Sequence, residues 1–492
     1  MNKPFPKEET RQVIIESLPE NDQATSKPAM TVAFTYVPPS HARALDPDNT
    51  VVEGIRGAGK SFWWAALHSE SHRRFVAAVF PETRIGRNLI TSQGFGTHLS
   101  PDLAPSKDTV AQLAKEFELR HVWRAVVATQ VKFPAPYPRE GKWPEKVKWV
   151  AENPESYDEL LYAVDEALFR EGKTHLILFD ALDRLADDWQ RIRPIAKALF
   201  QVALDLKGCR SIRLKLFVRP DMIEDRDILA FPDSSKLLAR RVSLAWRRVD
   251  LYALLFQCLG NAETGGEGFR NHCRDVFALT WEQEVESNSW ILPRPLRSDE
   301  DIQKEVFHAI TGPTMASGPS GHKRGFPYTW LPNHLLDGRD QVSPRSFCAA
   351  LRQAAVLETV GDWPYPLHYR TIHSGVQEAS RIRVHEITRE DYPWVTILME
   401  PLRGQITVPC SAKEIQSLWD TTGTMNELRD FTDQTDVVKL PPQHQDQGSE
   451  GLLIDLQGLG IIQRLSGGKI QMPDVYRIAF GLGRKGGVKP LK

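Results

Sequence analysis

The sequence lacks any long hydrophobic run: no stretch of its 492 residues approaches the apolar length needed to span a bilayer. Its opening residues, MNKPFPKEETRQ, also lack the apolar centre of a secretory signal. The sequence has neither an internal repeat nor a coiled-coil heptad pattern. We therefore expect a cytoplasmic protein that has no membrane partner.

Cysteine is scarce, and net charge is nearly absent. The 5 cysteines include no C-x-x-C pair, which argues against a zinc knuckle or a disulfide framework. The chain has 62 Lys and Arg against 63 Asp and Glu, a net charge of −1. Overall composition thus shows no bias toward nucleic acid, and any basic surface must be local. The length predicts several structured units rather than a single core.

Short apolar runs that alternate with helical periodicity are the main pattern of the first half. Residues 1–30 are polar and contain several prolines, which predicts a flexible leader. In the core that follows, a strongly periodic helix is expected at 109–131. Residues 142–149, which mix Lys with Trp, are expected to form an exposed insertion, which could equally be a partner-docking surface. Fully apolar runs between helices are typical of buried parallel strands. The expected strands are 31–37, 50–54, 75–80, 174–180, 212–220 and 240–246.

The second half of the chain has a different character. Residues 250–404 predict mainly helices, interrupted by a Gly- and Pro-rich stretch at 311–327. Residues 405–492 predict two helices followed by a hairpin around the Gly467-Gly468 turn. Helix, helix and hairpin in this order is typical of a winged-helix domain.

A phosphate-binding motif directly follows the apolar run at 50–54. Residues 54–61, Gly-Ile-Arg-Gly-Ala-Gly-Lys-Ser, match G-x-x-x-x-G-K-[ST] between an expected strand and an expected helix. Backbone N–H groups at the glycines can turn toward phosphates, Lys60 can reach the β and γ oxygens, and the Ser61 hydroxyl can bind Mg²⁺. The sequence therefore predicts ATP with Mg²⁺ as ligands. The expected nucleotide contacts are Gly54, Arg56, Gly57, Ala58, Gly59, Lys60, Ser61 and Phe62.

Two acids follow the apolar run at 174–180. Asp180 ends this run, at the position where ATPases with this loop carry a carboxylate facing Mg²⁺, so Ser61 and Asp180 are the expected metal ligands. Asp183 is the next acid available to orient or deprotonate the attacking water. It is equally suited to cap a helix, with Arg184 as its solvated neighbour.

Two arginines are further candidates for contact with phosphate. Arg219 ends the run at 212–220, where its side chain could meet a γ-phosphate and act in catalysis. Its alternative role is a surface ion pair with Asp221 or Glu224. Arg345 lies at an expected helix start, where a cation opposes the helix dipole unless an anion compensates. Arg345 is therefore either a phosphate contact or an ordinary exposed side chain.

The end of the chain is its most basic stretch. YRIAFGLGRKGGVKPLK has no acid and follows the expected wing, so it could neutralise DNA phosphates. The alternatives are an ordinary soluble tail or a loop docked on the core. The cations in question are Arg477, Arg484, Lys485, Lys489 and Lys492.

The order of these motifs resembles the AAA+ and STAND branch of P-loop ATPases, especially origin-recognition-like and KAP-type members. The matching pieces are residues 54–61, 176–184 and 214–220, and SPRSF at 343–347 is similar to the lid motif called sensor 2. The resemblance implies an α/β fold: a P-loop NTPase core with a parallel sheet, then a helical lid domain and a C-terminal winged helix. The implied boundaries are 1–30, 31–249, 250–404 and 405–492. The implied roles are Walker B acid for Asp180, sensor for Arg219 and lid arginine for Arg345.

One position departs from that pattern. Many relatives carry a second acid directly after the Walker B aspartate, whereas this chain has Ala181. The resemblance then implies slow ATP hydrolysis, or a substitute role for Asp183.

Proteins of the STAND type are nucleotide switches. The resemblance accordingly implies an ATPase that acts through a separate effector protein or by self-association, in a bacterial anti-phage or conflict system. One alternative is an initiator or loader ATPase that binds DNA through the winged helix and the basic tail. Another alternative is a scaffold that binds nucleotide without turnover.

Overall fold

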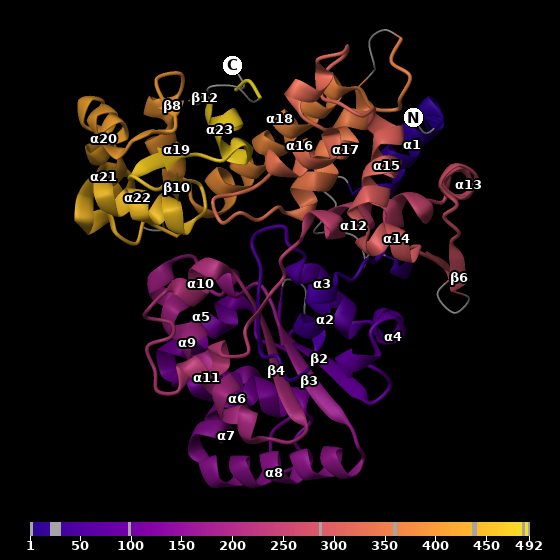
Figure 1. Ribbon diagram of the computed structural model, residues 1–492. Coiled ribbons are helices and arrows are strands. Elements are labelled where there is room, and N and C mark those ends of the chain that lie inside the picture. Colours follow the sequence, from indigo (N-terminus) through magenta and orange to yellow (C-terminus); the bar gives the residue numbers. More distant parts are fainter. Residues whose placement is uncertain are drawn as a thin grey trace. The chain divides into compact units, whose positions relative to one another are not determined.

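A computed structural model describes residues 3–19, 31–96, 100–284, 288–357, 362–434, 440–484 and 488–490 (Figure 1). The chain divides into two compact units. The sheet unit is Val37–Ala245, and the helical unit combines Met1–Tyr36 with Trp246–Lys492. Within the described residues, no helix combines the length and the apolar character needed to cross a membrane.

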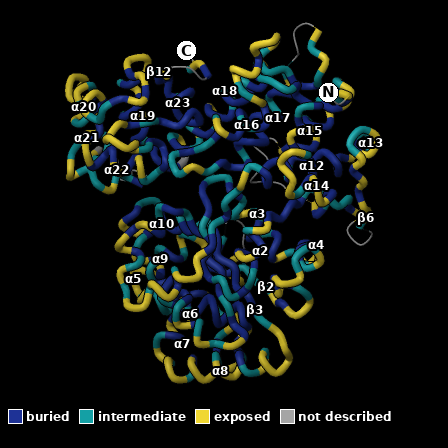
Figure 2. Tube along the Cα trace, viewed as in Figure 1, coloured by how far each residue is buried: buried dark blue, intermediate teal, exposed yellow. Residues whose placement is uncertain are grey.

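The sheet unit is built on a five-stranded parallel sheet with the order β2-β3-β4-β1-β5. The central strands are nearly inaccessible to solvent, as Figure 2 shows, and every residue of 176–179 is 0% exposed. Because all strands run the same way, their carboxyl ends meet at one edge of the sheet. The strands are β1 (Val51–Glu53), β2 (Leu89–Phe95), β3 (Thr174–Phe179), β4 (Ile212–Val218) and β5 (Val242–Ser243).

Helices cover both faces of this sheet, which explains its continuous apolar runs. On one face, Leu178 and Phe217 join a buried cluster with Trp63 of α3. On the other face, the Trp123 ring of α6 meets the rings of Phe95 and Phe179 edge to face, with centroids 6.1 and 5.8 Å apart. The helices of this unit are α2 (Pro39–Leu45), α3 (Lys60–His68), α4 (Glu70–Val79), α5 (Lys107–Glu116), α6 (Leu119–Gln130), α7 (Trp143–Glu152), α8 (Pro154–Arg170), α9 (Trp189–Asp205), α10 (Pro220–Glu224) and α11 (Ser234–Leu238).

The expected strand at 75–80 is wrong, because most of this segment belongs to helix α4. The strand that pairs in its place is β2, whose sequence LITSQGF is too polar in its middle to stand out as an apolar run. β2 lies at the edge of the sheet and pairs only with β3 within it. An edge strand tolerates polar side chains that a central strand would exclude.

Three other local expectations in this half are also wrong. The apolar segment at 31–37 contains a 3₁₀ turn, Val32–Phe34, instead of a strand. The helix expected at 109–131 is two helices, α5 and α6, because Phe117 between them has an extended backbone. Residues 143–149 belong to α7, and the segment is not an exposed insertion: Trp143 is 8% exposed, and its indole N–H donates to the carbonyl of Pro101 at 2.7 Å.

The helical unit includes part of the expected leader. Residues 7–17 form helix α1 (Lys7–Ser17), which packs on α17 with Val13 and Ile14 buried. Residues 20–30 of the expected leader lie outside the described residues. The elements up to the winged helix are α12 (Arg248–Gly260), α13 (Gly266–Phe277), β6 (Glu282–Glu284), β7 (Ser289–Ile291), α14 (Arg294–Ser298), α15 (Glu300–Thr311), α16 (Pro327–Asn333), α17 (Pro344–Val356) and α18 (Tyr369–His385).

The last described part of the chain is the expected winged helix, with one helix, Thr424–Gln434, in addition to the two expected. A three-stranded sheet with the order β10-β11-β9 forms around the Gly467-Gly468 turn, whose φ angles are +90° and +75°. Ser411 and Glu414 make a capping box at the first helix after β9. The elements are α19 (Trp394–Met399), β8 (Thr407–Val408), β9 (Cys410–Ser411), α20 (Ala412–Thr421), α21 (Thr424–Gln434), α22 (Gly448–Gly458), β10 (Gln463–Arg464), β11 (Lys469–Gln471), α23 (Asp474–Phe480) and β12 (Gly483–Arg484).

The basic tail is partly built into the fold. Arg477 is 0% exposed, and its guanidinium donates to Asp474 at 2.6 Å and to two main-chain carbonyls. Arg484 pairs with the same aspartate at 3.1 Å. Arg477 is therefore a core residue and is closed to DNA, contrary to one of the sequence alternatives. Lys485 and Lys492 lie outside the described residues.

Candidate nucleotide-binding site

The glycine loop connects β1 to α3 at the carboxyl edge of the sheet. Gly57 and Gly59 have φ angles of +78° and +101°, a backbone conformation that side chains with a Cβ disfavour. At Gly54, an added Cβ would lie 3.2 Å from both the Ala58 Cβ and the Lys60 Cγ. The loop therefore requires its glycines for geometric reasons, and its backbone is free to approach a ligand closely.

Lys60 begins α3 and folds back over the loop. Its ammonium donates to the carbonyls of Gly54 at 2.7 Å and Ile55 at 3.1 Å. Burial lowers the pKa of Lys60 to about 8, and the negative charge of Asp180 opposes that shift. A phosphate would give this ammonium a charged partner in place of two carbonyls, which fits the role expected from the motif.

Helix α3 is anchored by its aromatic residues. The Trp63 indole N–H donates to His41 Nδ1 at 3.1 Å, and the Trp64 N–H donates to the Leu178 carbonyl at 3.4 Å. Phe62 is only partly buried and packs against Trp63, with ring centroids 4.9 Å apart. Ala58 is fully buried in the same cluster. These contacts fix the helix start, and with it the position of Lys60.

Asp180 follows β3 and is 4% exposed. Burial raises the pKa of this carboxyl, and the Ser61 hydroxyl, the Lys60 charge and the Ala181 N–H oppose the shift. The two expected Mg²⁺ ligands, Ser61 and Asp180, are thus within hydrogen-bonding reach of each other. These neighbours only partly offset the cost of burying the charged Asp180 carboxylate. A divalent cation bound beside it would offset the rest.

The described part of the chain contains no cluster of three or more His, Cys, Asp and Glu side chains that could hold a metal by itself. Ser61 and Asp180 still fit Mg²⁺, because this cation is commonly held by one or two protein oxygens, phosphates and water.

The residues after Asp180 make a tight turn. Ala181 has φ +57° and ψ +35°, a left-handed conformation that is unusual for alanine, and it precedes the 3₁₀ turn Leu182–Arg184. Asp183 lies inside this turn. Its carboxylate accepts from Arg219, whereas the next helix, α9, is capped by Asp188. The side chain of Asp183 is therefore directed at the arginine.

Arg219 lies between two carboxylates at the end of β4. Its Nη1 donates to Asp183 Oδ2 at 3.1 Å, while its Nε and Nη2 donate to Asp221 Oδ1 and Oδ2 at 3.1 and 3.0 Å. Burial raises the pKa of Asp183, but the charges of Arg219 and Lys60 outweigh burial and hold that pKa below its ordinary value. The Arg219 side chain thus lies at the strand end, as expected for a phosphate contact. It also forms the ion pair with Asp221 that was expected as its alternative role.

Asp221 belongs to this site, although the sequence predicted it only as a surface partner of Arg219. Its side chain is only 12% exposed, and it binds the guanidinium through both oxygens. The spacing in the sequence could have indicated this role. Asp221 lies two residues after an arginine at a strand end, and the proline between them starts α10.

Arg345 belongs to the helical unit, whereas all the other predicted site residues belong to the sheet unit. It is in the first turn of α17, which is capped by the Ser343 hydroxyl. Its Nη1 lies 2.8 Å from Glu386 Oε1, and 35% of its side chain is exposed. The anion that compensates its position at a helix start is thus a carboxylate of the same unit.

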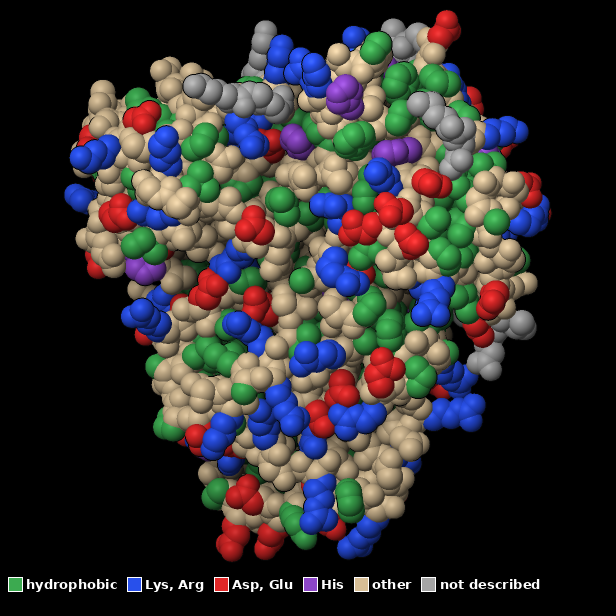
Figure 3. All heavy atoms as spheres, viewed as in Figure 1, with side chains coloured by type: hydrophobic (Ala, Val, Ile, Leu, Met, Phe, Trp, Pro, Cys, Tyr) green, Lys and Arg blue, Asp and Glu red, His purple; other side chains and the backbone are tan. Residues whose placement is uncertain are grey.

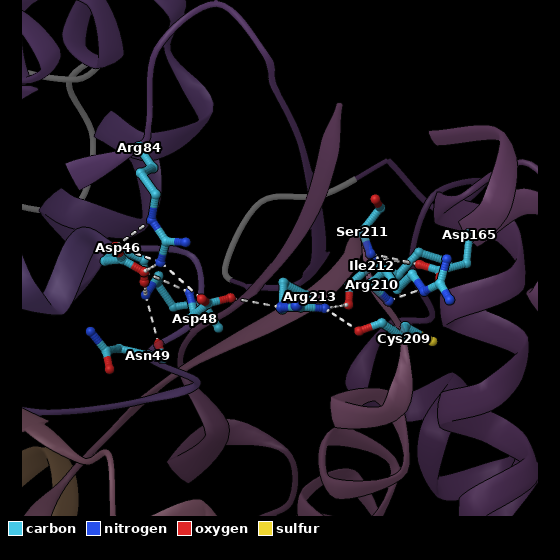
Figure 4. Close-up of polar contacts among 11 residues, drawn as sticks. Asp46, Asp48, Asn49, Arg84, Asp165, Cys209, Arg210, Ser211, Ile212 and Arg213 are labelled. Atoms are coloured by element: carbon cyan, nitrogen blue, oxygen red, sulfur yellow. Dashed lines mark hydrogen bonds and ion pairs between the residues drawn. The ribbon is translucent and has the colours of Figure 1, made fainter. Parts of the chain in front are cut away.

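A second polar cluster lies at the amino edge of the sheet, opposite the glycine loop (Figure 4). Arg84 pairs with Asp46 and Asp48 at 2.6 and 2.8 Å, and Arg213 joins Asp48 at 2.9 Å. Asp46, Asp48 and Arg84 also line an open pocket of about 370 Å³. These pairs tie the segment before β1 to β4, and the pocket is separate from the phosphate loop.

No model of a known protein family matches the chain, and no curated protein matches it. Among solved structures, the chain is similar to the Aeropyrum pernix ORC2 protein in its ADPNP–ADP complexes, at 14% identity and a TM-score of 0.37, over 90% of this chain and 93% of that chain. The ADP form of that protein gives 14% identity, a TM-score of 0.33 and the same coverages, 90% and 93%.

Cdc6p from Pyrobaculum aerophilum is also similar, at 11% identity and a TM-score of 0.28, over 92% of this chain and 93% of that chain. These structures are of the origin-recognition kind that the motifs resemble. Their identities and TM-scores are too low to carry an argument about function, which depends here on the residues of the site.

Proposed function

We propose that this protein is an ATP-binding switch ATPase that acts through partner proteins. The observation that carries the proposal is the convergence of Lys60, Ser61 and Asp180 at the carboxyl edge of one sheet. In this proposal the loop amides and Lys60 hold the phosphates, while Ser61 and Asp180 hold Mg²⁺. The bound cation would neutralise charge on the β and γ oxygens.

Hydrolysis transfers the γ-phosphoryl group of ATP to water and releases ADP, and each side chain has a place in that reaction. Asp183 is the carboxylate available to orient the attacking water, because Ala181 supplies none. Arg219 is the cation available to stabilise charge on the transferred group. The hydrogen bond of Asp183 to Arg219 competes with the orientation of water, which favours slow basal turnover.

The direct test of this proposal is nucleotide binding and turnover in purified protein. We expect wild type to bind ATP in the presence of Mg²⁺ and to hydrolyse it slowly. Lys60→Ala should abolish binding, and Asp180→Ala should abolish turnover and weaken the effect of Mg²⁺. ATP binding by Lys60→Ala at wild-type affinity would refute the proposal. Binding without turnover in any variant would favour the scaffold alternative.

The solvent face of α22 favours a protein partner over DNA. This helix occupies the position before the wing, and its exposed residues Glu450, Ile454 and Gln457 share one face at i, i+4 and i+7. None of them is basic, whereas a helix that reads DNA needs cations for the phosphates. On the face of the sheet unit seen in Figure 3, basic and acidic side chains are also intermixed.

The DNA alternative can be tested by adding duplex DNA to the ATPase assay at two salt concentrations. Lys469 is exposed on the wing and is the natural site for a charge reversal. We expect no stimulation by DNA and no effect of Lys469→Glu. DNA stimulation that is lost both in Lys469→Glu and at high salt would favour an initiator or loader ATPase instead.

The finer proposal is a role in a bacterial anti-phage or conflict system. Its support is the resemblance of the motifs to STAND proteins. The test is survival of phage challenge by cells that express this chain with the products of its neighbouring genes. Lys60→Ala should remove any protection, and equal survival with wild type and empty vector would contradict the role.

A further inference from the structure

Among the contacts of the Arg219 guanidinium, those with Asp221 and Asp183 are unequal. Asp221 takes the Nε and Nη2 edge through both carboxylate oxygens, at 3.1 and 3.0 Å. Asp183 takes only Nη1, through one oxygen at 3.1 Å. The side chains of Arg219 and Asp221 are both 12% exposed, and that of Asp183 is 21% exposed. The contact with Asp221 is the stronger one because it has two hydrogen bonds. The contact with Asp183 therefore breaks first.

We propose that Asp221 is a positioning residue that holds Arg219, so that its Nη1 edge exchanges Asp183 for the γ-phosphate of ATP. This inference rests on the proposed function, because it assumes that ATP phosphates occupy the glycine loop. Pro220, between Arg219 and Asp221, has a fixed φ and begins α10, which keeps the fork rigid. The exchange is non-covalent and needs no other reactant.

The exchange has a consequence for both neighbours of the arginine. Without a γ-phosphate, Asp183 remains bound to Arg219 and is not free to orient water. With ATP present, Arg219 turns to the phosphate and releases Asp183 for that role. ADP offers no γ-phosphate, so the pair between Asp183 and Arg219 persists. The three residues thus make the site sensitive to the difference between ATP and ADP.

The sign of one mutational effect separates positioning from simple charge. Removing any carboxylate near a polyanionic nucleotide should tighten binding by reducing repulsion. If only charge mattered, Asp221→Asn and Asp183→Asn would both tighten binding. If Asp221 positions Arg219, its loss weakens ATP binding instead, while loss of Asp183 removes a competitor and tightens it. The two variants then differ in sign.

The experiment measures dissociation constants of full-length protein for ADPNP, a non-hydrolysable ATP analogue, and for ADP, each with Mg²⁺. Asp221→Asn should weaken ADPNP binding about tenfold and change ADP binding by less than about twofold. Asp183→Asn should tighten ADPNP binding severalfold. In an Arg219→Ala background, Asp221→Asn should no longer weaken ADPNP binding. Asp227→Asn is the matched control, because this carboxylate is 73% exposed and faces Arg193.

A second variant, Asp221→Glu, keeps the negative charge but moves the carboxylate from the position in which both of its oxygens bind Arg219. It too should weaken ADPNP binding selectively, and thermal unfolding verifies that each variant is folded. Equal weakening of ADPNP and ADP by both Asp221 variants, or tighter ADPNP binding by Asp221→Asn, would overturn the inference. Lys60→Ala separates the two proposals: if it alone loses binding while the Asp221 variants match Asp227→Asn, the proposed function stands and the exchange fails.

Discussion

Lys215 is a charged residue in the interior of a parallel sheet. It is 0% exposed, and its ammonium donates to the carbonyls of Ala44, Asp46 and Asn49 at 2.6, 2.9 and 2.7 Å. Burial lowers the pKa of Lys215 to about 7, and the charges of Asp46 and Asp48 oppose that shift. The side chain ties the segment before β1 to β4, at the edge opposite the glycine loop.

The lowered pKa of Lys215 makes stability depend on pH. The unfolded chain keeps this proton up to about pH 10.4. The cost of burying the charge is therefore present in full below pH 7 and is relieved as the pH rises from about 7. The unfolding free energy of wild type should increase by about 2 kcal/mol more than that of Lys215→Met between pH 7 and 9. Guanidinium unfolding at both pH values measures this, and parallel pH profiles would contradict it.

Ala181 makes a second prediction for a single residue. Its φ of +57° costs an alanine roughly 1 kcal/mol relative to a right-handed conformation, and glycine pays little of that cost. Ala181→Gly should therefore raise the unfolding free energy by up to about 1 kcal/mol in denaturant unfolding. Ala163→Gly on the exposed side of α8 is the control, with an expected loss of about 1 kcal/mol. A loss of similar size in both variants would show that the turn is not strained.

At the scale of elements, α23 shows how the end of the chain is held. It follows the wing and packs on α18, where the Ser380 hydroxyl accepts from the Ala479 N–H at 3.1 Å. The Arg383 guanidinium donates to the Tyr476 hydroxyl at 3.2 Å. Arg477 joins α23 to the segment after it, because its Nη2 donates to the Val488 carbonyl at 2.6 Å.

Loss of Arg477 should detach this terminal segment. Arg477→Met removes the donor of two buried carbonyls and leaves Arg484 as the arginine partner of Asp474, so we expect a loss of about 3 kcal/mol in unfolding free energy. Limited proteolysis should then cut near residue 488 faster than in wild type. Arg484→Gln is the matched control: its side chain is 38% exposed, and the expected loss is below about 1 kcal/mol. Equal protease resistance of Arg477→Met and wild type would contradict this packing role.

At the scale of the whole molecule, the predicted nucleotide contacts other than Arg345 all belong to the sheet unit, Val37–Ala245. We expect residues 37–245 to fold alone and to bind ADP. At an ADP concentration 100 times the dissociation constant, binding should stabilise this fragment by about 2.7 kcal/mol. Thermal unfolding with and without ADP measures the effect, and the same fragment carrying Lys60→Ala should show none. A fragment that stays unfolded would mean that the two units form one cooperative structure.

The sequence alone determined the features that depend on local chemistry. The spacing of Gly54, Gly59, Lys60 and Ser61 predicted the loop, and the apolar runs predicted β1, β3 and β4 because central parallel strands must be buried on both faces. The Gly467-Gly468 turn predicted the hairpin of the winged helix, because positive φ angles favour glycine.

Tertiary structure decided what depends on neighbours distant in sequence. β2 is polar and forms a strand because it pairs with β3. Most of the apolar segment that resembled a strand belongs to α4 instead. The contacts of Arg219 with Asp183 and Asp221, and the burial of Arg477, arise only when separate elements meet. Local patterns encode which residues can bind a phosphate. The partner of each charge is set by packing, because ion pairs depend on distances that the sequence does not contain.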